Sequence, residues 1–188
     1  MNEIIALDIG CGLSPYNVYS AKWLYGIDIF KNHKIIEFLV RDWLNKPMEM
    51  TLAGYSYCDI ASDRIPFSDN YFDRISAIDV LEHIPRVIYC PARKFAFVDA
   101  MSEIYRVLKP GGEFFSCTPF YPHGEAFSDP THVNFLTPET FDYFTCNGRY
   151  GFVGGFDILS INTAGCKLHV RLRKPLISPP EENGIFLC

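Results

Sequence analysis

The feature that most constrains this chain is an apolar run that ends in a glycine turn, followed by a second run that ends in a carboxylate. The first run leads through Asp8 to Gly10-Cys11-Gly12, and the second ends at Asp28. A near-continuous apolar run is typical of a strand covered on both faces, and a glycine turn lets backbone N–H groups approach a ligand closely. A carboxylate after the next strand can accept hydrogen bonds from ribose hydroxyls. The pattern predicts a doubly wound α/β protein that binds a ribose-containing cofactor.

The length, the net charge and the cysteines limit the number of domains and the kinds of partner and compartment to expect. The 188 residues fit one domain, expected over residues 1–174 with a loosely attached tail over 175–188, and the formal net charge of −5 argues against a nucleic-acid partner. No apolar run is long enough to span a membrane, and the N-terminus has no signal-peptide pattern, so neither a membrane partner nor secretion is expected. The seven cysteines are scattered without a CxxC pair, which favours reduced, buried thiols in a cytoplasmic protein over disulfides or zinc ligands.

Strands and helices alternate along the chain, which predicts a mostly parallel sheet. Strands are expected over residues 4–9, 24–29, 55–58, 74–80, 113–118, 156–162 and 167–173. Four helices are expected: two over residues 34–44 and 92–108, and two short ones that begin at Ser14-Pro15 and at Thr137-Pro138. The last two strands are joined too tightly for anything but an antiparallel hairpin. In the last strand, Lys167, His169, Arg171 and Arg173 alternate with apolar residues. This basic face is expected to be open to solvent or to a second copy of the chain in a homodimer.

Four motifs follow one another in a characteristic order: the glycine turn, Asp59-Ile60 at the end of the third strand, Ala77-Ile78-Asp79-Val80-Leu81-Glu82-His83-Ile84 at the end of the fourth, and Ile104-Tyr105-Arg106-Val107-Leu108-Lys109-Pro110-Gly111-Gly112 before the fifth. In this respect residues 4–118 resemble the class I S-adenosylmethionine-dependent methyltransferases, within which the chain is similar to those of bacterial polysaccharide and natural-product clusters. The resemblance implies a Rossmann-like, seven-stranded, mostly parallel sheet with an antiparallel last strand. It also implies S-adenosyl-L-methionine as cofactor and S-adenosyl-L-homocysteine as product. Relatives usually carry a covering helix ahead of the first strand, which is expected to be absent here.

The resemblance also implies which residues hold the cofactor. The glycine turn would meet the methionine moiety, Asp28 would bind the ribose, and residues after the third strand would bind the adenine. The expected set is Asp8, Gly10, Cys11, Gly12, Asp28, Ile29, Asp59, Ile60, Ile78 and Asp79. Asp59 has a second interpretation as a cap of the segment that follows it. The family's usual third glycine is Ser14 here, and the stretch before Asp28 is short.

The acceptor side is expected in the loops after the fourth and fifth strands, with residues 119–150 as its cover. His132 is the candidate general base, because a neutral imidazole accepts a proton near pH 7. Asp129 would orient it, and His83 would act beside them or form the pocket wall. The alternative interpretation is that Asp129 and His132 only hold the loop to the domain. No third or fourth ligand accompanies them, so no metal is expected.

These expectations combine into a function: methyl transfer to a small-molecule acceptor, through an oxygen nucleophile such as a sugar or natural-product hydroxyl. The alternative is a methyltransferase-like subunit that binds the cofactor, or a partner, without catalysis. A nicotinamide oxidoreductase is disfavoured, because Pro15 stands where the dinucleotide fingerprint needs a glycine.

Overall fold

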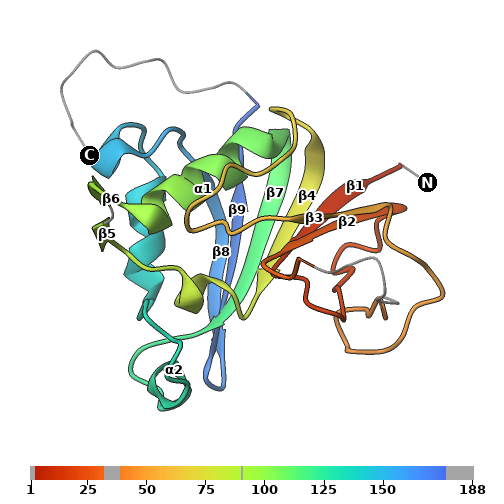
Figure 1. Cartoon of the computed structure of the whole chain (residues 1–188), viewed down its shortest axis with the longest axis horizontal. Coiled ribbons are helices and arrows are strands. Elements are labelled where there is room, and N and C mark those ends of the chain that lie inside the picture. The colour runs from red at the N-terminus through yellow and green to blue at the C-terminus, as the bar shows by residue number, and fades with distance from the viewer. Residues whose placement is uncertain (1–2, 32–38, 90, 177–188) are drawn as a thin grey trace.

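The computed structural model describes residues 3–31, 39–89 and 91–176. Their centre is a seven-stranded sheet in the order β3-β2-β1-β4-β7-β9-β8 (Figure 1). Strands β1 to β4 and β7 are parallel, and β9 runs antiparallel to both of its neighbours. The expected Rossmann-like fold is confirmed, with the antiparallel strand last in the chain. The strands are β1 (Ile5–Ile9), β2 (Trp23–Asp28), β3 (Gly54–Tyr57), β4 (Phe72–Ile78), β7 (Leu108–Pro119), β8 (Asp157–Ala164) and β9 (Lys167–Arg173).

One face of the sheet carries the main core. Leu7, Ile75 and Phe114 are fully buried at the centre of three adjacent strands. Helix α1 (Ala96–Val107) lies over this face (Figure 1) and buries a stripe that includes Met101 and Ile104. The Lys174 ammonium closes the helix end by donating hydrogen bonds to the carbonyls of residues 105 and 108, where the helix dipole favours a cation. The end of the helix is thereby fixed beside the start of β7, and the site lies at the carboxyl ends of β4 and β7.

Two expected helices are contradicted, one of them over its described part. Residues 10–22 form a loop rather than a helix from Ser14-Pro15, and residues 39–44 are not helical. Residues 34–38 of the expected 34–44 helix lie outside the described residues. Instead the two segments pair, with Leu39 N–H donating to Leu13 O and Arg41 N–H to Pro15 O. The physical reason is length, because a helix rises only about 1.5 Å per residue and an extended chain about 3.3 Å. Extended segments therefore cover the distance back to the start of β2 in fewer residues than a helix would.

The remaining elements are short. Strands β5 (Ile88–Tyr89) and β6 (Arg93–Lys94) form a hairpin where the first residues of the expected 92–108 helix would lie. The 3₁₀ helix η3 (Pro138–Phe144) begins at Thr137 with a capping box, as the Thr-Pro pair predicts. The described residues form three other short helices: η2 (Leu81–His83), α2 (Glu125–Ser128) and η4 (Arg149–Gly151). None of the helices in the described part of the chain is long and apolar enough to cross a membrane.

The expected basic face of β9 is open only in part. Arg171 and Arg173 are exposed, and each contacts an acid: Glu113 at 2.7 Å and Asp157 at 3.4 Å. His169 is half-buried, because the Trp43 ring packs edge-on against it at 5.7 Å between centroids. A hollow of about 380 Å³ remains between this tryptophan and strands β7, β8 and β9. The face is therefore largely charge-neutral, and its pairing with a second copy stays a prediction.

The cysteines follow the expectation with one exception. Cys11, Cys58 and Cys117 are buried free thiols, and Cys166 is also free. Cys146 is in a disulfide, which corrects the expectation of reduced thiols throughout. It lies in the irregular segment after η3, outside the strands to which the argument from buried thiols applied.

Candidate functional site

The glycine turn after β1 is locked against the end of β2. Gly10 has a φ of +66°, and a Cβ atom there would lie 2.3 Å from the Val80 side chain, so only glycine fits. Its N–H donates to Ile27 O at 2.8 Å. Gly12 also has a positive φ, and its N–H donates to the Asp28 carboxylate at 2.8 Å. A Cβ atom on Gly12 would meet nothing within 4 Å, which leaves open space beside the turn.

Asp8 supports this turn from beneath. Its carboxyl is buried and accepts hydrogen bonds from the Tyr16 N–H and the Ser76 hydroxyl, both at 2.8 Å. Burial raises the pKa of Asp8 to about 7, against the effect of these two hydrogen bonds. Through the Tyr16 N–H, Asp8 holds the loop that follows the turn.

The other expected cofactor residues lie at or just after the carboxyl ends of β1, β2, β3 and β4. Asp28 ends β2, is 8% exposed, and accepts a second hydrogen bond from the Phe30 N–H. The Ile29 side chain is 64% exposed, so an apolar surface is available beside it. The Asp59 carboxylate accepts the Ala61 N–H at 3.0 Å, so it caps its own turn, as its second interpretation expects. Cys11 and Ile60 are buried, and Ile78 ends β4.

Asp79 follows β4 with a φ of +53° and has a partner that sequence reasoning missed. The Lys167 ammonium, at the start of β9, lies 2.5 Å from its carboxylate. The two residues are far apart in sequence, and the register that places Pro119 opposite Lys167 brings them together. Lys167 thus contributes a positive charge at the methionine end of the expected site.

The three expected catalytic residues lie close together, beside Glu82, which was not among the expected residues. The His83 and His132 rings lie 4.8 Å apart, and His132 Nε2 is 4.0 Å from both Asp129 Oδ2 and Glu82 Oε1. Glu82 is 1% exposed, and its Oε2 accepts the Thr118 hydroxyl at 2.8 Å. Burial raises the pKa of the Glu82 carboxyl. Hydrogen bonds from the side chain and N–H of Thr131 lower the pKa of the exposed Asp129.

The loop that carries His132 is pinned to η2. The N–H groups of Val133 and Asn134 both donate to the Glu82 carbonyl at 2.9 Å. The Asn134 side chain is buried and donates to Leu81 O, and the Arg86 guanidinium donates to its Oδ1 at 2.7 Å. The loop is thus held to the domain by its backbone and by Asn134, whereas the alternative interpretation concerned the side chains of Asp129 and His132 and stays a prediction. The two histidines and the two acids are nevertheless left facing one another.

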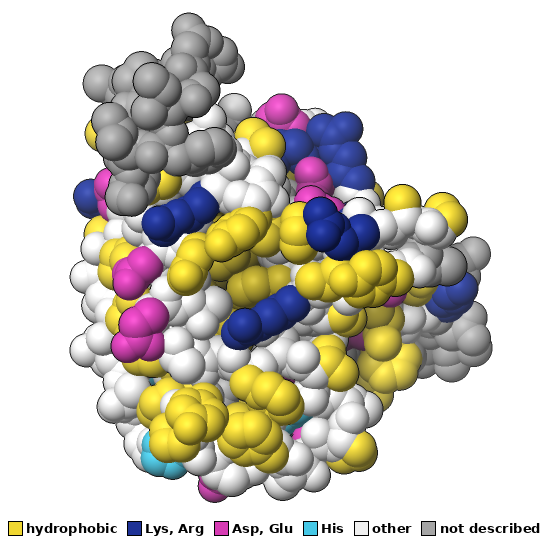
Figure 2. Space-filling model, turned by 90° about the vertical axis from the view of Figure 1, so that its left-hand side faces the viewer, with side chains coloured by type: hydrophobic (Ala, Val, Ile, Leu, Met, Phe, Trp, Pro, Cys, Tyr) yellow, Lys and Arg dark blue, Asp and Glu magenta, His cyan; other side chains and the backbone are white. Residues whose placement is uncertain are grey.

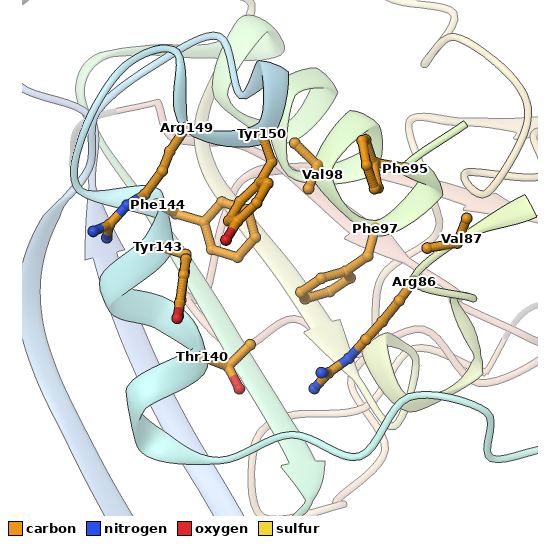
Figure 3. A pocket seen from close by; sticks show the side chains of 10 residues that line it. All are labelled: Arg86, Val87, Phe95, Phe97, Val98, Thr140, Tyr143, Phe144, Arg149 and Tyr150. Carbon is orange, nitrogen blue, oxygen red and sulfur yellow. The ribbon is translucent and has the colours of Figure 1, made fainter. Parts of the chain in front are cut away.

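A second hollow, of about 360 Å³, lies behind this loop, between η3, η4 and the start of α1. Figure 2 shows this face, where apolar side chains gather around isolated cations. In the close-up, Arg86 and Arg149 lie on opposite sides of an aromatic lining that includes Phe97 and Tyr143 (Figure 3). The Arg149 guanidinium lies over the Tyr143 ring at 4.8 Å. Arg86 links this hollow to the loop with His132, since it also donates to the Phe135 carbonyl.

Comparison with known proteins agrees with this geometry. A family model described as a methyltransferase domain matches residues 7–116. Demethylmenaquinone methyltransferase of Geobacillus sp. (strain WCH70) is 28% identical over 114 residues, which are 57% of this chain and 42% of that protein. Cycloartenol-C-24-methyltransferase 1 of Oryza sativa subsp. japonica is 34% identical over 109 residues, 56% of this chain and 27% of that protein. The chain therefore covers less than half the length of these curated relatives.

The fold has counterparts among solved structures. An S-adenosylmethionine-dependent methyltransferase from Mesorhizobium loti superposes with a TM-score of 0.57 at 12% identity, over 92% of this chain and 91% of that one. At this identity the likeness shows the fold alone.

Proposed function

Because the chain belongs to the class I S-adenosylmethionine-dependent methyltransferase family, we propose that it transfers the methyl group of S-adenosylmethionine to an oxygen atom of a small-molecule acceptor. The observation that carries the proposal is the glycine turn fixed to Asp28, with open space beside Gly12. This is the place in an open α/β sheet where ligands bind, past the carboxyl ends of the strands. Sugar and natural-product hydroxyls are the acceptors we favour.

The residues present fit the cofactor. Gly10 and Gly12 allow the backbone to approach the methionine part, Asp28 offers a carboxylate to the ribose, and the exposed Ile29 offers an apolar surface to the adenine. Cys11, Asp59, Ile60, Ile78 and Asp79 complete the wall. When bound, S-adenosylmethionine supplies a methyl group that its sulfonium already activates. The protein therefore has mainly to hold the acceptor in line and to exclude competing nucleophiles.

The acceptor side supports an oxygen nucleophile. A hydroxyl must lose its proton as the new bond forms, whereas a neutral amine attacks without prior proton loss. His132 is the residue we assign to this activation, because its Nδ1 is bound to the Ala126 carbonyl at 3.3 Å while Nε2 faces Glu82 and Asp129. His83 stands beside it as a second imidazole. The products are the methyl ether, S-adenosylhomocysteine and a proton.

Titration calorimetry with S-adenosylmethionine tests the proposal, followed by mass spectrometry of hydroxylated acceptors incubated with the protein. Saturable binding and an acceptor that gains one methyl group support it. Binding without transfer to any acceptor would favour the alternative of a methyltransferase-like subunit that binds the cofactor without catalysis. Absence of binding at high micromolar cofactor would end the enzymatic proposal.

A further inference from the structure

We propose that Glu82, His83 and His132 bind a divalent cation of the Zn²⁺ class at the acceptor side of the crevice. One ligand atom from each residue lies within 4.8 Å of the other two. Two imidazoles and one carboxylate form a ligand set that zinc uses in catalytic sites, where the fourth position stays open. The sequence led us to expect no metal, because Glu82 was not recognised as the third ligand.

The first observation behind the proposal is an orphaned oxygen. Glu82 is 1% exposed and its Oε2 accepts the Thr118 hydroxyl, but Oε1 has no hydrogen-bond partner among the described residues. A buried carboxylate oxygen without a donor is costly, because it has lost its water and gained nothing in return. This oxygen points toward His132, at 4.0 Å from Nε2. A cation between the two atoms would satisfy both.

The second observation is the orientation of the two imidazoles. His132 Nδ1 contacts the Ala126 carbonyl, which can only accept, so Nδ1 carries the proton and Nε2 keeps its lone pair. His83 Nδ1 lies 3.2 Å from the Thr131 carbonyl and 3.0 Å from the Thr131 hydroxyl. That hydroxyl donates its own proton to Asp129 at 2.6 Å, so it too accepts from His83.

In both rings Nε2 is therefore the nitrogen whose lone pair can bind a metal. A metal-bound histidine usually donates its other N–H to a carbonyl or an acid, and such partners fix the tautomer in advance of binding. Here Ala126, Thr131 and Asp129 already do so.

The scaffold around the three ligands is also fixed. The Val133 and Asn134 N–H groups hold the loop to the Glu82 backbone, so Glu82 and His132 cannot separate without breaking two hydrogen bonds. Ligand atoms around a tetrahedral zinc ion lie roughly 3.3 Å apart, given bonds of about 2.0–2.2 Å. The Glu82 Oε1–His132 Nε2 distance is 4.0 Å and the three ligand atoms lie within 4.8 Å of one another, so they must approach by up to about 1.5 Å when the ion binds, mainly by movement of the exposed His83 side chain. Imidazole ligands favour zinc over magnesium or calcium, which prefer oxygen ligands.

The role of the cation rests on the proposed function. Its open position would bind the acceptor hydroxyl and lower the pKa of that group, as zinc does for bound water. The hydroxyl proton passes to solvent, the oxygen forms a bond to the methyl carbon, and the electron pair of the broken carbon–sulfur bond remains on sulfur. His132 then activates the acceptor as a metal ligand rather than by accepting the proton itself. The substrate class is narrowed to acceptors whose oxygen can coordinate a metal.

The test is metal binding by the whole chain, freed of metal with EDTA and studied without S-adenosylmethionine. Zn²⁺ is titrated by calorimetry, and Co²⁺ by the visible absorption that reports its ligands. We expect one ion per chain. His132→Ala and His83→Ala should each weaken binding at least about 100-fold, more than the loss of an outer-shell partner costs. Glu82→Gln keeps the size of the buried side chain and should weaken binding at least about 10-fold. His123→Ala, an exposed histidine of the same connection, is the matched control and should bind as the wild type does.

Two results would overturn the site: no saturable Zn²⁺ binding, or equal binding by the wild type and both histidine variants. Far-ultraviolet circular dichroism checks the fold, and His83→Ala remains decisive if the Glu82 variant unfolds, because the His83 side chain is exposed. S-adenosylmethionine binding in EDTA is measured separately. Cofactor binding without zinc binding defeats only the metal site, and zinc binding without cofactor binding defeats only the proposed function.

Discussion

Replacing Asp8 by asparagine tests the support beneath the glycine turn. The Asp8 carboxyl is buried between the Tyr16 N–H and the Ser76 hydroxyl, and burial raises its pKa from 3.8 to about 7. An unfolded chain releases this proton near pH 4. Between about pH 4 and pH 7, the native state therefore holds a proton that the unfolded state has lost.

The sign of the effect follows from this difference. Because the native state binds the extra proton, its stability falls as the pH rises through this window, by about 1.4 kcal/mol for each pH unit and by about 4 kcal/mol in all. Above about pH 7 both states are ionised and the contribution no longer changes. Asparagine has nearly the same shape and can accept the Tyr16 N–H, but it has no proton to release.

The assay is urea unfolding of both proteins without cofactor, followed by the fluorescence of Trp23 and Trp43, from about pH 5 to pH 8.5. The wild-type free energy of unfolding minus that of Asp8→Asn should decrease from pH 5 to 7 and then level off. Other titrating groups are common to both proteins and cancel in this difference. A difference that stays constant over the whole range would show that native Asp8 is ionised throughout, and would refute the reasoning.

Four further predictions concern the site and the assembly. Asp28→Ala should weaken S-adenosylmethionine binding by about 1.5–3 kcal/mol in calorimetry, because hydrogen bonds to a charged group are lost; unchanged affinity would contradict the ribose assignment. Gly10→Ala should lower the free energy of unfolding by about 1–3 kcal/mol in urea titrations, from its positive φ and the contact with Val80. When Val80→Ala is added to Gly10→Ala, the free energy of unfolding should rise only by the share lost to the contact with Val80. Full recovery of the lost free energy would show that the backbone at position 10 is unstrained. His132→Ala should reduce turnover and leave cofactor affinity unchanged, and wild-type rates would remove it from the reaction. Light scattering should show a dimer if the open face of β9 pairs two copies, and a strict monomer excludes that pairing.

The strands were predictable from the sequence because the pattern of apolar residues shows which faces of each strand are buried. The run that becomes β1 is apolar almost throughout, and the alternation of β9 indicated one covered face, which Leu168, Val170 and Leu172 occupy with no exposure. The helix from Ser14 failed because Ser-Pro is a local signal for a helix start, whereas the distance back to Trp23 is set by the sheet. Similarly, the Lys109–Gly112 segment followed the end of α1 as expected but also became the bulged start of β7, which pairs with β4 on both sides of the bulge and bonds to the Lys174 backbone just after β9.

The site residues likewise fall into those that a local sequence pattern places together and those that only the tertiary structure brings together. The glycine turn and Asp28 are close in sequence, and the strand–turn–strand pattern alone places them together, which their 2.8 Å hydrogen bond now shows. Glu82 and His132 are brought together by a loop whose return depends on two backbone hydrogen bonds, and no periodicity in the sequence encodes those. A signal was nevertheless present. Glu82 is a charged residue between Leu81 and His83, and both Leu81 and Ile84 in this short segment are buried. A carboxylate in an apolar setting must find a partner or stay protonated, so its burial is itself a reason to search for a cation or a donor nearby.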